Sequence, residues 1–212
     1  EMDRLSNIIK AFNEQFGKSK AVDENGNPKL LYHGSPNKSI TALDNTGVRR
    51  INGGEPGYIY ATDGYDLAEE FSREKFRGQS NLSVVLGDAG RVYPVYMRME
   101  NPLDFRNLTD TDIDNMVDAA KKYSQFKDTV PAQLEKARTD KGMAQQYLKR
   151  EAEDLVSHLE EYGYDGLISE ARKGGSYEYA VISPSQVYMA EDQDTRFETL
   201  STRLPSAKGI GV

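Results

Sequence analysis

Three short segments that favour β-structure each contain one polar side chain at a position where a core-facing strand has no need of it. The segments are residues 30–35 (Leu-Leu-Tyr-His-Gly-Ser), 58–63 (Tyr-Ile-Tyr-Ala-Thr-Asp) and 177–181 (Tyr-Glu-Tyr-Ala-Val). Their polar members are His33, Tyr60 and Glu178. Alternation along a strand places Glu178 on the same face as Ala180 and Ile182. A carboxylate on an apolar strand face is costly unless it is paired or serves a function.

Each of these three residues also has a purely structural interpretation. In that interpretation Glu178 reaches solvent from an edge strand, or it pairs with Arg172 or Lys173. His33 is then a hydrogen-bonded structural residue and Tyr60 is part of the core. The residues taken singly leave both interpretations open.

Composition limits the class of protein. The 212 residues fit one domain, and 37% hydrophobic with 29% charged residues describe a globular protein that is soluble. The absence of cysteine excludes disulfides, thiolate catalysis and cysteine-ligated metals, and with only two histidines no metal site is expected. A net charge of −7 argues against tight, non-specific binding to nucleic acid.

The N-terminus lacks the apolar stretch of a signal peptide, and no apolar run approaches the length of a membrane span. We therefore expect no membrane partner and a cytoplasmic location. The chain begins with Glu1 rather than methionine, which suggests that it was cut from something larger.

The order of strand-like and helix-like segments predicts one domain over residues 1–190 and a polar tail or linker over 191–212. Further strands are expected at residues 92–99, 164–169 and 187–189, and the Gly-, Asn- and Ser-rich residues 36–56 are expected to form a long loop. A helix is expected after Asp63, with Glu69 and Arg73 spaced as a surface ion pair.

Residues 109–158 are predicted to be helical in two or three pieces. Apolar side chains recur there at helical spacing in two stripes: Ile113, Met116, Val117 and Ala120, then Tyr147, Leu148, Ala152, Leu155 and Leu159. Pro131 suits the first turn of the piece between the two stripes. Such stripes indicate either a packed structural insertion at about 107–160 or a surface for target recognition.

Taken together, the motifs resemble those of the His-Tyr-Glu class of ADP-ribosyltransferases, the group that includes diphtheria toxin and the poly(ADP-ribose) polymerases. The matching residues are Tyr32-His33-Gly34-Ser35, then Ile59-Tyr60 with Asp63 and Phe71, and last Glu178-Tyr179-Ala180-Val181 followed by Gln186-Val187. The likeness runs from about residue 30 to 188, and the wider layout resembles the transferase domains of phage polyvalent proteins and related bacterial effectors. It implies an α+β fold, a split β-sandwich of two small antiparallel sheets with peripheral helices and a helical insertion.

The resemblance also implies roles for individual residues. His33 would hydrogen-bond the adenosine-side ribose of NAD, and the Gly34 backbone would hold the nicotinamide carboxamide. Tyr60 and Phe71 would sandwich the nicotinamide ring. Glu178 would bind the 2′-hydroxyl of the nicotinamide ribose and stabilise the oxocarbenium-like sugar as nicotinamide leaves. His33, Tyr60 and Glu178 are thus the expected catalytic residues.

The remaining NAD-binding candidates are Ser35, which ends the first motif, and Arg49 and Arg50 in the loop, which suit the pyrophosphate. The two arginines equally fit a solvated loop. Ser176 stands where arginine-specific transferases carry an acidic or amide residue, so that class is not indicated.

The sequence thus predicts an NAD-dependent mono-ADP-ribosyltransferase, a toxin- or effector-like protein delivered into a host cell or acting in the cytoplasm. A protein acceptor is favoured over nucleic acid because the chain is acidic. The alternatives are an NAD glycohydrolase, which uses water as acceptor, and an inactive NAD-binding module. The presence of Glu178 argues against the inactive module.

Overall fold

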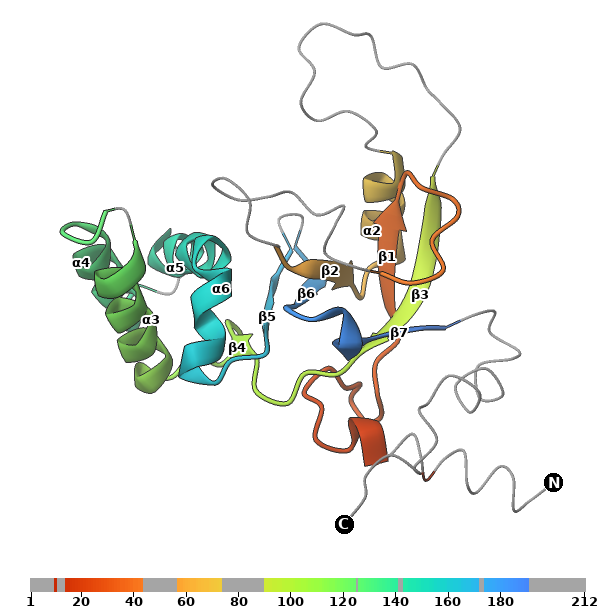
Figure 1. Cartoon of the computed structure of the whole chain (residues 1–212), viewed down its shortest axis with the longest axis horizontal. Helices are drawn as coiled ribbons and strands as arrows, with labels where there is room; N and C mark the ends of the chain where they lie inside the picture. Colours follow the sequence, from red (N-terminus) through yellow and green to blue (C-terminus); the bar gives the residue numbers. More distant parts are fainter. Residues whose placement is uncertain are drawn as a thin grey trace, which may run out of the picture. The chain divides into compact units, whose positions relative to one another are not determined.

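The computed structural model describes residues 10, 14–43, 57–73, 90–124, 126–140, 143–171 and 174–190. The chain divides into two compact units, whose elements are labelled in Figure 1. Unit 1 comprises Glu1–Leu43, Ala61–Glu100 and Ser185–Val212, and unit 2 comprises Asp44–Tyr60 and Asn101–Pro184. The expected tail at 191–212 lies outside the described residues.

Seven strands follow the hydrogen-bonded order β4-β5-β6-β2-β1-β3-β7, and the division between the units falls within β2. Unit 1 contains β1 (Leu31–Ser35), the second half of β2 (Ile59–Thr62), β3 (Arg91–Met97) and β7 (Val187–Met189). The short 3₁₀ turn η3 (Pro184–Gln186) leads into β7 and starts at the last residue of unit 2. Unit 2 contains the first half of β2, β4 (Leu103–Asp104), β5 (Gly166–Glu170) and β6 (Tyr177–Val181). The mixed α and β content is as predicted.

One strand pair differs in direction from the expected antiparallel sheets. The β1–β2, β1–β3, β3–β7 and β5–β6 pairs are antiparallel, whereas β4 and β5 are parallel. A parallel pair requires a long crossover connection. The helices between β4 and β5 supply that connection.

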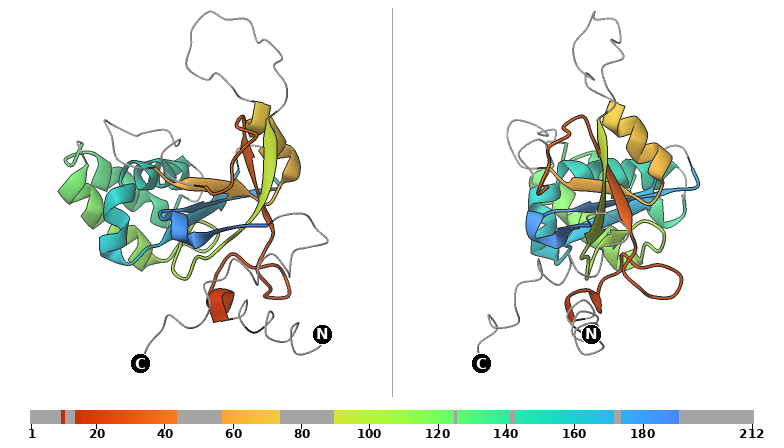
Figure 2. Two further views of the ribbon diagram at one scale, coloured as in Figure 1. Left: turned by 45° about the vertical axis from the view of Figure 1, so that its right-hand side comes forward. Right: turned by 90° about the vertical axis from the view of Figure 1, so that its right-hand side faces the viewer.

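In unit 1, strand β1 lies between β2 and β3, and helix α2 (Tyr65–Arg73) packs against β1 and β3 (Figure 2). Tyr32 of β1 is opposite Thr62 of β2, and His33 is opposite Tyr93 of β3. The rings of Tyr32 and Tyr65 meet edge to face, with centroids 5.3 Å apart. The aromatic contact therefore attaches the first turn of α2 to the strand that carries the first motif.

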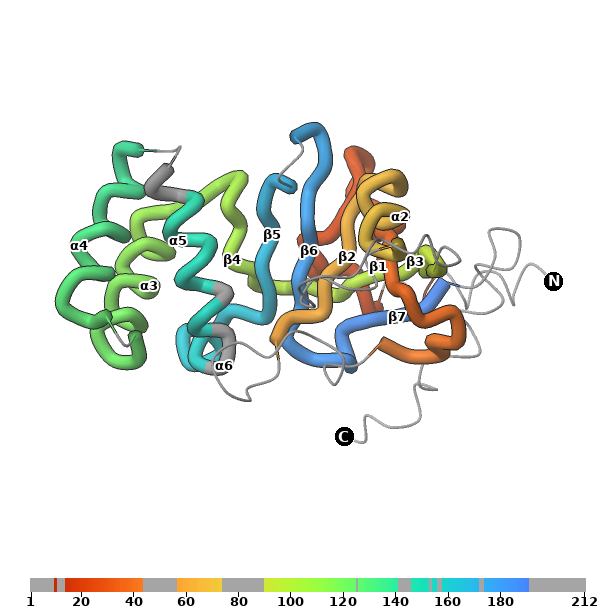
Figure 3. Tube along the Cα trace, turned by 90° about the horizontal axis from the view of Figure 1, so that it is seen from above, coloured from red at the N-terminus to blue at the C-terminus, as the bar shows by residue number. Residues whose placement is uncertain are grey.

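Unit 2 contains the predicted helical region, as α3 (Asp110–Tyr123), α4 (Val130–Glu135), α5 (Met143–Asp154) and α6 (Val156–Leu159), with the short turns η1 (Lys136–Arg138) and η2 (Glu160–Tyr162). Helices α3, α4 and α5 lie side by side (Figure 3). Helix α3 begins with a capping box, in which Thr109 and Asp112 each accept the other's backbone N–H. Pro131 occupies the first turn of α4, as predicted. None of the helices in the described ranges is long and apolar enough to cross a membrane.

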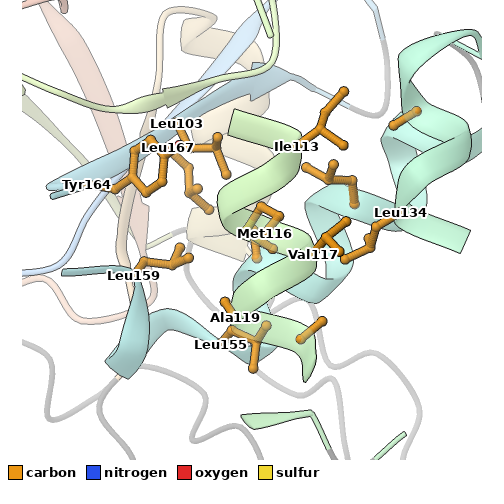
Figure 4. Packing of buried hydrophobic residues seen from close by; sticks show 14 of the residues in the cluster. Leu103, Ile113, Met116, Val117, Ala119, Leu134, Leu155, Leu159, Tyr164 and Leu167 are labelled. Carbon is orange, nitrogen blue, oxygen red and sulfur yellow. The ribbon is translucent and has the colours of Figure 1, made fainter. Parts of the chain in front are cut away.

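Both predicted stripes face the core of unit 2 (Figure 4). The buried members are Ile113, Met116, Val117 and Ala120 of α3, with Leu148, Ala152, Leu155 and Leu159 from the second stripe, and Tyr147 packs against them partly buried. Tyr58, Leu167 and Ala180 belong to the same cluster. The helices therefore share one hydrophobic core with strands β5 and β6.

Candidate functional site

The first motif forms strand β1, and its residues alternate between two faces. Tyr32 and Gly34 point towards helix α2. Strand alternation therefore places His33 on the opposite face, together with Ser35. His33 is partly buried and lies directly opposite Tyr93. The histidine is thus held by a strand that is paired on both edges.

Gly34 is required by the packing of helix α2 on strand β1. A Cβ atom at this position would lie 1.7 Å from the carbonyl oxygen of Ala68 and 2.9 Å from the backbone nitrogen of Ser72. The family resemblance assigned the Gly34 backbone to the nicotinamide carboxamide, but on the side-chain side of this glycine the neighbouring group is the backbone of α2. A ligand that binds at Gly34 must therefore contact the backbone N–H or carbonyl of this glycine.

The residues that follow β1 are fixed by polar contacts. The buried Ser35 hydroxyl accepts the backbone N–H of Asn37 at 3.2 Å. The Tyr93 hydroxyl donates to the carbonyl of Asn37 at 2.6 Å and accepts the N–H of Ile40 at 3.1 Å. The beginning of the predicted 36–56 loop is therefore held against β3.

The second motif continues from β2 into helix α2. Asp63, which follows β2, accepts from the ammonium of Lys29 at 2.6 Å, and Thr62 Oγ1 accepts the backbone N–H of Gly64 at 3.1 Å. These contacts fix the turn that leads into α2. Further along the helix Phe71 is 39% exposed, so its ring has a free surface on which a planar group can stack.

Tyr60 is a partly buried residue of unit 2. Its ring packs against the hydrophobic core and meets the Tyr58 ring edge to face, with centroids 6.0 Å apart. Tyr58 is itself buried and donates its hydroxyl proton to the carbonyl of Ala152 in α5 at 3.1 Å. The position of the Tyr60 ring is therefore set by the core and by an aromatic neighbour that is anchored to a helix.

Glu178 is the second residue of β6 and has a charged partner that the sequence did not suggest. Its Oε2 accepts from the ammonium of Lys149 in α5 at 2.8 Å, and the two side chains are 17% and 21% exposed. The partners suggested by the sequence, Arg172 and Lys173, lie outside the described residues. No local pattern signals this pair, because 29 positions separate its members.

The strand residues next to Glu178 show which face of the sheet its side chain occupies. Ser169 of β5 is buried and directly opposite Glu178, so both side chains leave the sheet on the same face. Tyr177 leaves on the other face, where the Arg106 guanidinium lies 5.6 Å from its ring centre. Arg106 is held by both carboxylate oxygens of Asp104, and this hydrogen bonding raises the pKa of Arg106. Among the described residues, the cation in contact with Glu178 is Lys149.

Helix α5 carries a buried carboxylate, Glu151, which is 8% exposed. Burial raises the pKa of Glu151, the Asp154 carboxylate adds to the rise, and a hydrogen bond with Tyr147 opposes it. The folded state then holds this proton more tightly than the unfolded state does. The free energy of unfolding therefore falls as pH rises from the unfolded pKa, about 4.3, through the raised folded pKa.

We expect Glu151→Gln to raise the melting temperature at pH 7, because the amide keeps the hydrogen-bonding shape without the buried charge. The difference in melting temperature from the parent should shrink towards zero near pH 4. This pH is roughly the unfolded pKa of a glutamate, so the buried carboxyl of the folded parent is then neutral. Thermal unfolding across this pH range measures both effects, with the exposed Glu160→Gln as control. A variant that is equally destabilised at pH 7 and pH 4 would contradict the prediction.

The structure groups the candidate residues by unit. Unit 1 holds His33, Gly34 and Ser35 on β1 and Phe71 on α2, two elements in contact. Unit 2 holds Tyr60 and Glu178, on the neighbouring strands β2 and β6. Arg49 and Arg50 lie outside the described residues. In the described ranges, no three His, Cys, Asp or Glu side chains are grouped in a way that suits a metal ion.

A family model described as ADP-ribosyltransferase in polyvalent proteins matches residues 23–197. The matched range is more than half of the chain and includes all three motifs. No curated protein and no solved structure matches the chain.

Proposed function

Because the chain belongs to the ADP-ribosyltransferases of polyvalent proteins, we propose that it is a mono-ADP-ribosyltransferase that uses NAD, modifies a protein and releases nicotinamide. The observation that carries the proposal is the Glu178 carboxylate, which is largely withdrawn from solvent and fixed on a strand with a charged partner. A carboxylate of this kind stabilises positive charge that develops on a sugar.

In the proposed reaction the bond between ribose C1′ and the nicotinamide nitrogen breaks, and both electrons leave with nicotinamide, which becomes neutral. The positive charge moves to the ribose, where the negative charge of Glu178 stabilises it more strongly than it stabilises the ground state. The nucleophile of the acceptor then forms a bond to C1′. Its proton passes to the Glu178 carboxylate and from there to water.

The proposed NAD contacts follow the family resemblance. Tyr60 and Phe71 stack on the nicotinamide ring, which the exposed surface of Phe71 supports. The Gly34 backbone holds the carboxamide through its N–H or carbonyl, because helix α2 fills the side-chain direction of this glycine. His33 hydrogen-bonds the adenosine-side ribose.

Three further residues are proposed to contact NAD near its phosphates and ribose. Ser35 belongs to this set as the end of the first motif. Arg49 and Arg50 are proposed to bind the pyrophosphate, because guanidinium groups match the geometry of phosphate oxygens. No metal takes part in the proposed reaction.

A protein acceptor is proposed over nucleic acid because the chain carries a net charge of −7. The helices at about 107–160 use one side for the core of unit 2, and we assign any acceptor contacts of this segment to their opposite, polar side. Ser176 does not favour an arginine-specific enzyme.

The organisation of the chain is part of the same proposal. Residues 1–190 form the transferase domain, and 191–212 form a tail or linker. The split sandwich of two small sheets is proposed from the family resemblance, whereas the seven strands follow one hydrogen-bonded order. The protein is proposed to act in the cytoplasm or as a delivered effector.

The proposed function is tested by incubating the chain with labelled NAD and a cell lysate and measuring both macromolecular label and free nicotinamide. Label that requires the active chain supports transfer, and the labelled band identifies the acceptor. Nicotinamide release without label supports the glycohydrolase instead. Binding of NAD with neither product supports the inactive module.

His33→Ala is expected to raise the dissociation constant for NAD about 3- to 10-fold, because one hydrogen bond to the ribose is lost. Calorimetric titration of NAD into both proteins measures the change. The other histidine of the chain provides a matched control, since His158 stacks on Tyr123 with ring centroids 3.7 Å apart and is proposed to have no NAD contact. An unchanged dissociation constant in His33→Ala would remove this residue from the site.

A further inference from the structure

The carboxylate assigned to catalysis is held by a residue of the helical segment that a minimal transferase would not need. Lys149 lies in α5, within the 107–160 segment, and its ammonium donates to Glu178 Oε2 at 2.8 Å. In the described part of the chain, the Glu178 carboxylate has no second side-chain partner. The ion pair with Lys149 therefore fixes one oxygen of the carboxylate, Oε2.

This ion pair differs from the exposed pairs elsewhere in the chain. Its side chains are 21% and 17% exposed, whereas Lys122 and Asp118 in α3 are 52% and 50% exposed. Exposed pairs add little because water and salt screen them. A pair that has lost much of its water is more costly to break, because the remaining charge is left poorly solvated.

The backbone that carries Lys149 is fixed firmly. The residue before it, Leu148, and Ala152 one turn later are fully buried in the core of unit 2. The carbonyl of Ala152 also accepts the hydroxyl of Tyr58, which in turn contacts the ring of Tyr60. The backbone from which the Lys149 side chain extends is therefore anchored in the same hydrophobic core that positions Tyr60.

We propose that Lys149 is a positioning residue for the catalytic carboxylate, and that α5 contributes in this way to the chemistry of the site. The inference rests on the proposed function. Lys149 holds Oε2 so that the other oxygen faces the 2′-hydroxyl of the nicotinamide ribose. The Lys149 ammonium weakens the electrostatic effect of the Glu178 carboxylate on the ribose. Its contribution to catalysis is therefore to orient that carboxylate. A misplacement of about 1 Å at a reacting centre can lower the rate about 10²-fold.

The test compares Lys149→Met, Lys149→Gln and Lys149→Arg with the parent in steady-state transfer assays at varied NAD. Lys149→Met should lower kcat about 10- to 100-fold with less than about a threefold change in KM, because the orientation of Glu178 acts mainly in the transition state. Lys149→Arg keeps a charged donor and should restore most of kcat, and Lys149→Gln should fall between. A structural role alone would not produce this order with unchanged melting temperatures.

Arg150→Met is the matched control, because it removes one positive charge from the exposed side of the same helix. Its kcat should stay within about twofold of the parent, as is usual for surface changes. A kcat for Lys149→Met equal to or above that of the parent would overturn the inference. If the parent transfers nothing, the proposed function itself fails, and if Glu178→Gln transfers as well as the parent, the catalytic assignment of Glu178 fails and this inference with it. If transfer requires Glu178 but not Lys149, only this inference fails.

Discussion

Glu178→Gln is expected to lower the rate of ADP-ribosyl transfer by about 10²–10³-fold, because one preorganised electrostatic contact to the transition state is lost. The amide has nearly the same shape as the carboxylate, so strand β6 should keep its place. It lacks the negative charge that stabilises the oxocarbenium-like ribose and cannot take the proton of the acceptor. Initial rates of transfer at saturating NAD measure the effect.

Two controls separate lost chemistry from lost structure. Glu178→Gln should bind NAD with an affinity close to that of the parent and keep its circular dichroism spectrum. Glu170→Gln removes one charge from an exposed position of the neighbouring strand β5 and should transfer at the parent rate. Transfer by Glu178→Gln at the parent rate would contradict the catalytic assignment.

Gly34→Ala is expected to lower the free energy of unfolding by more than about 2 kcal/mol, which exceeds a usual surface change. The added methyl group would lie 1.7 Å from the Ala68 carbonyl oxygen, and backbone cannot rotate away as a flexible side chain can. Helix α2 must therefore move off strand β1 or lose its last turns. Denaturant unfolding measures the change.

Gly26→Ala is the matched control for this prediction. Gly26 has a φ of +80°, and a Cβ there would meet nothing within 4 Å. The control therefore adds only the strain of a left-handed backbone, about 1–2 kcal/mol. A Gly34→Ala variant as stable as the parent would show that α2 does not pack on β1 this closely.

Local pattern was sufficient to predict much of the fold. The helical spacing of Ile113, Met116 and Val117 identified core positions, because a helix buries one face and that face repeats every three or four residues. The Glu69–Arg73 pair was predicted from spacing alone and is present at 2.7 Å. The predicted strand at 187–189 matches β7 in full.

Features that depend on packing between distant segments could not be predicted. Lys149 has no periodic or motif signature, and its role depends on where α5 lies against β6. Gly34 was predicted as a ligand contact, but its close neighbour in the structure is the backbone of a helix more than 30 positions away in the sequence. The order of the strands, with β2 placed between β6 and β1, also depends on long-range pairing. The three motif residues were recognised only because their flanking residues resembled those of a family.

The most direct test of the proposed activity uses two preparations of NAD, one labelled in the adenosine part and one in nicotinamide, each incubated with the chain and an acceptor. We predict that the adenosine label becomes covalently attached to protein, that the nicotinamide label is released in equal amount, and that both changes are lost in Glu178→Gln. Release of nicotinamide with no adenosine label on protein would contradict the proposed transfer, and attachment that does not depend on Glu178 would contradict the catalytic assignment.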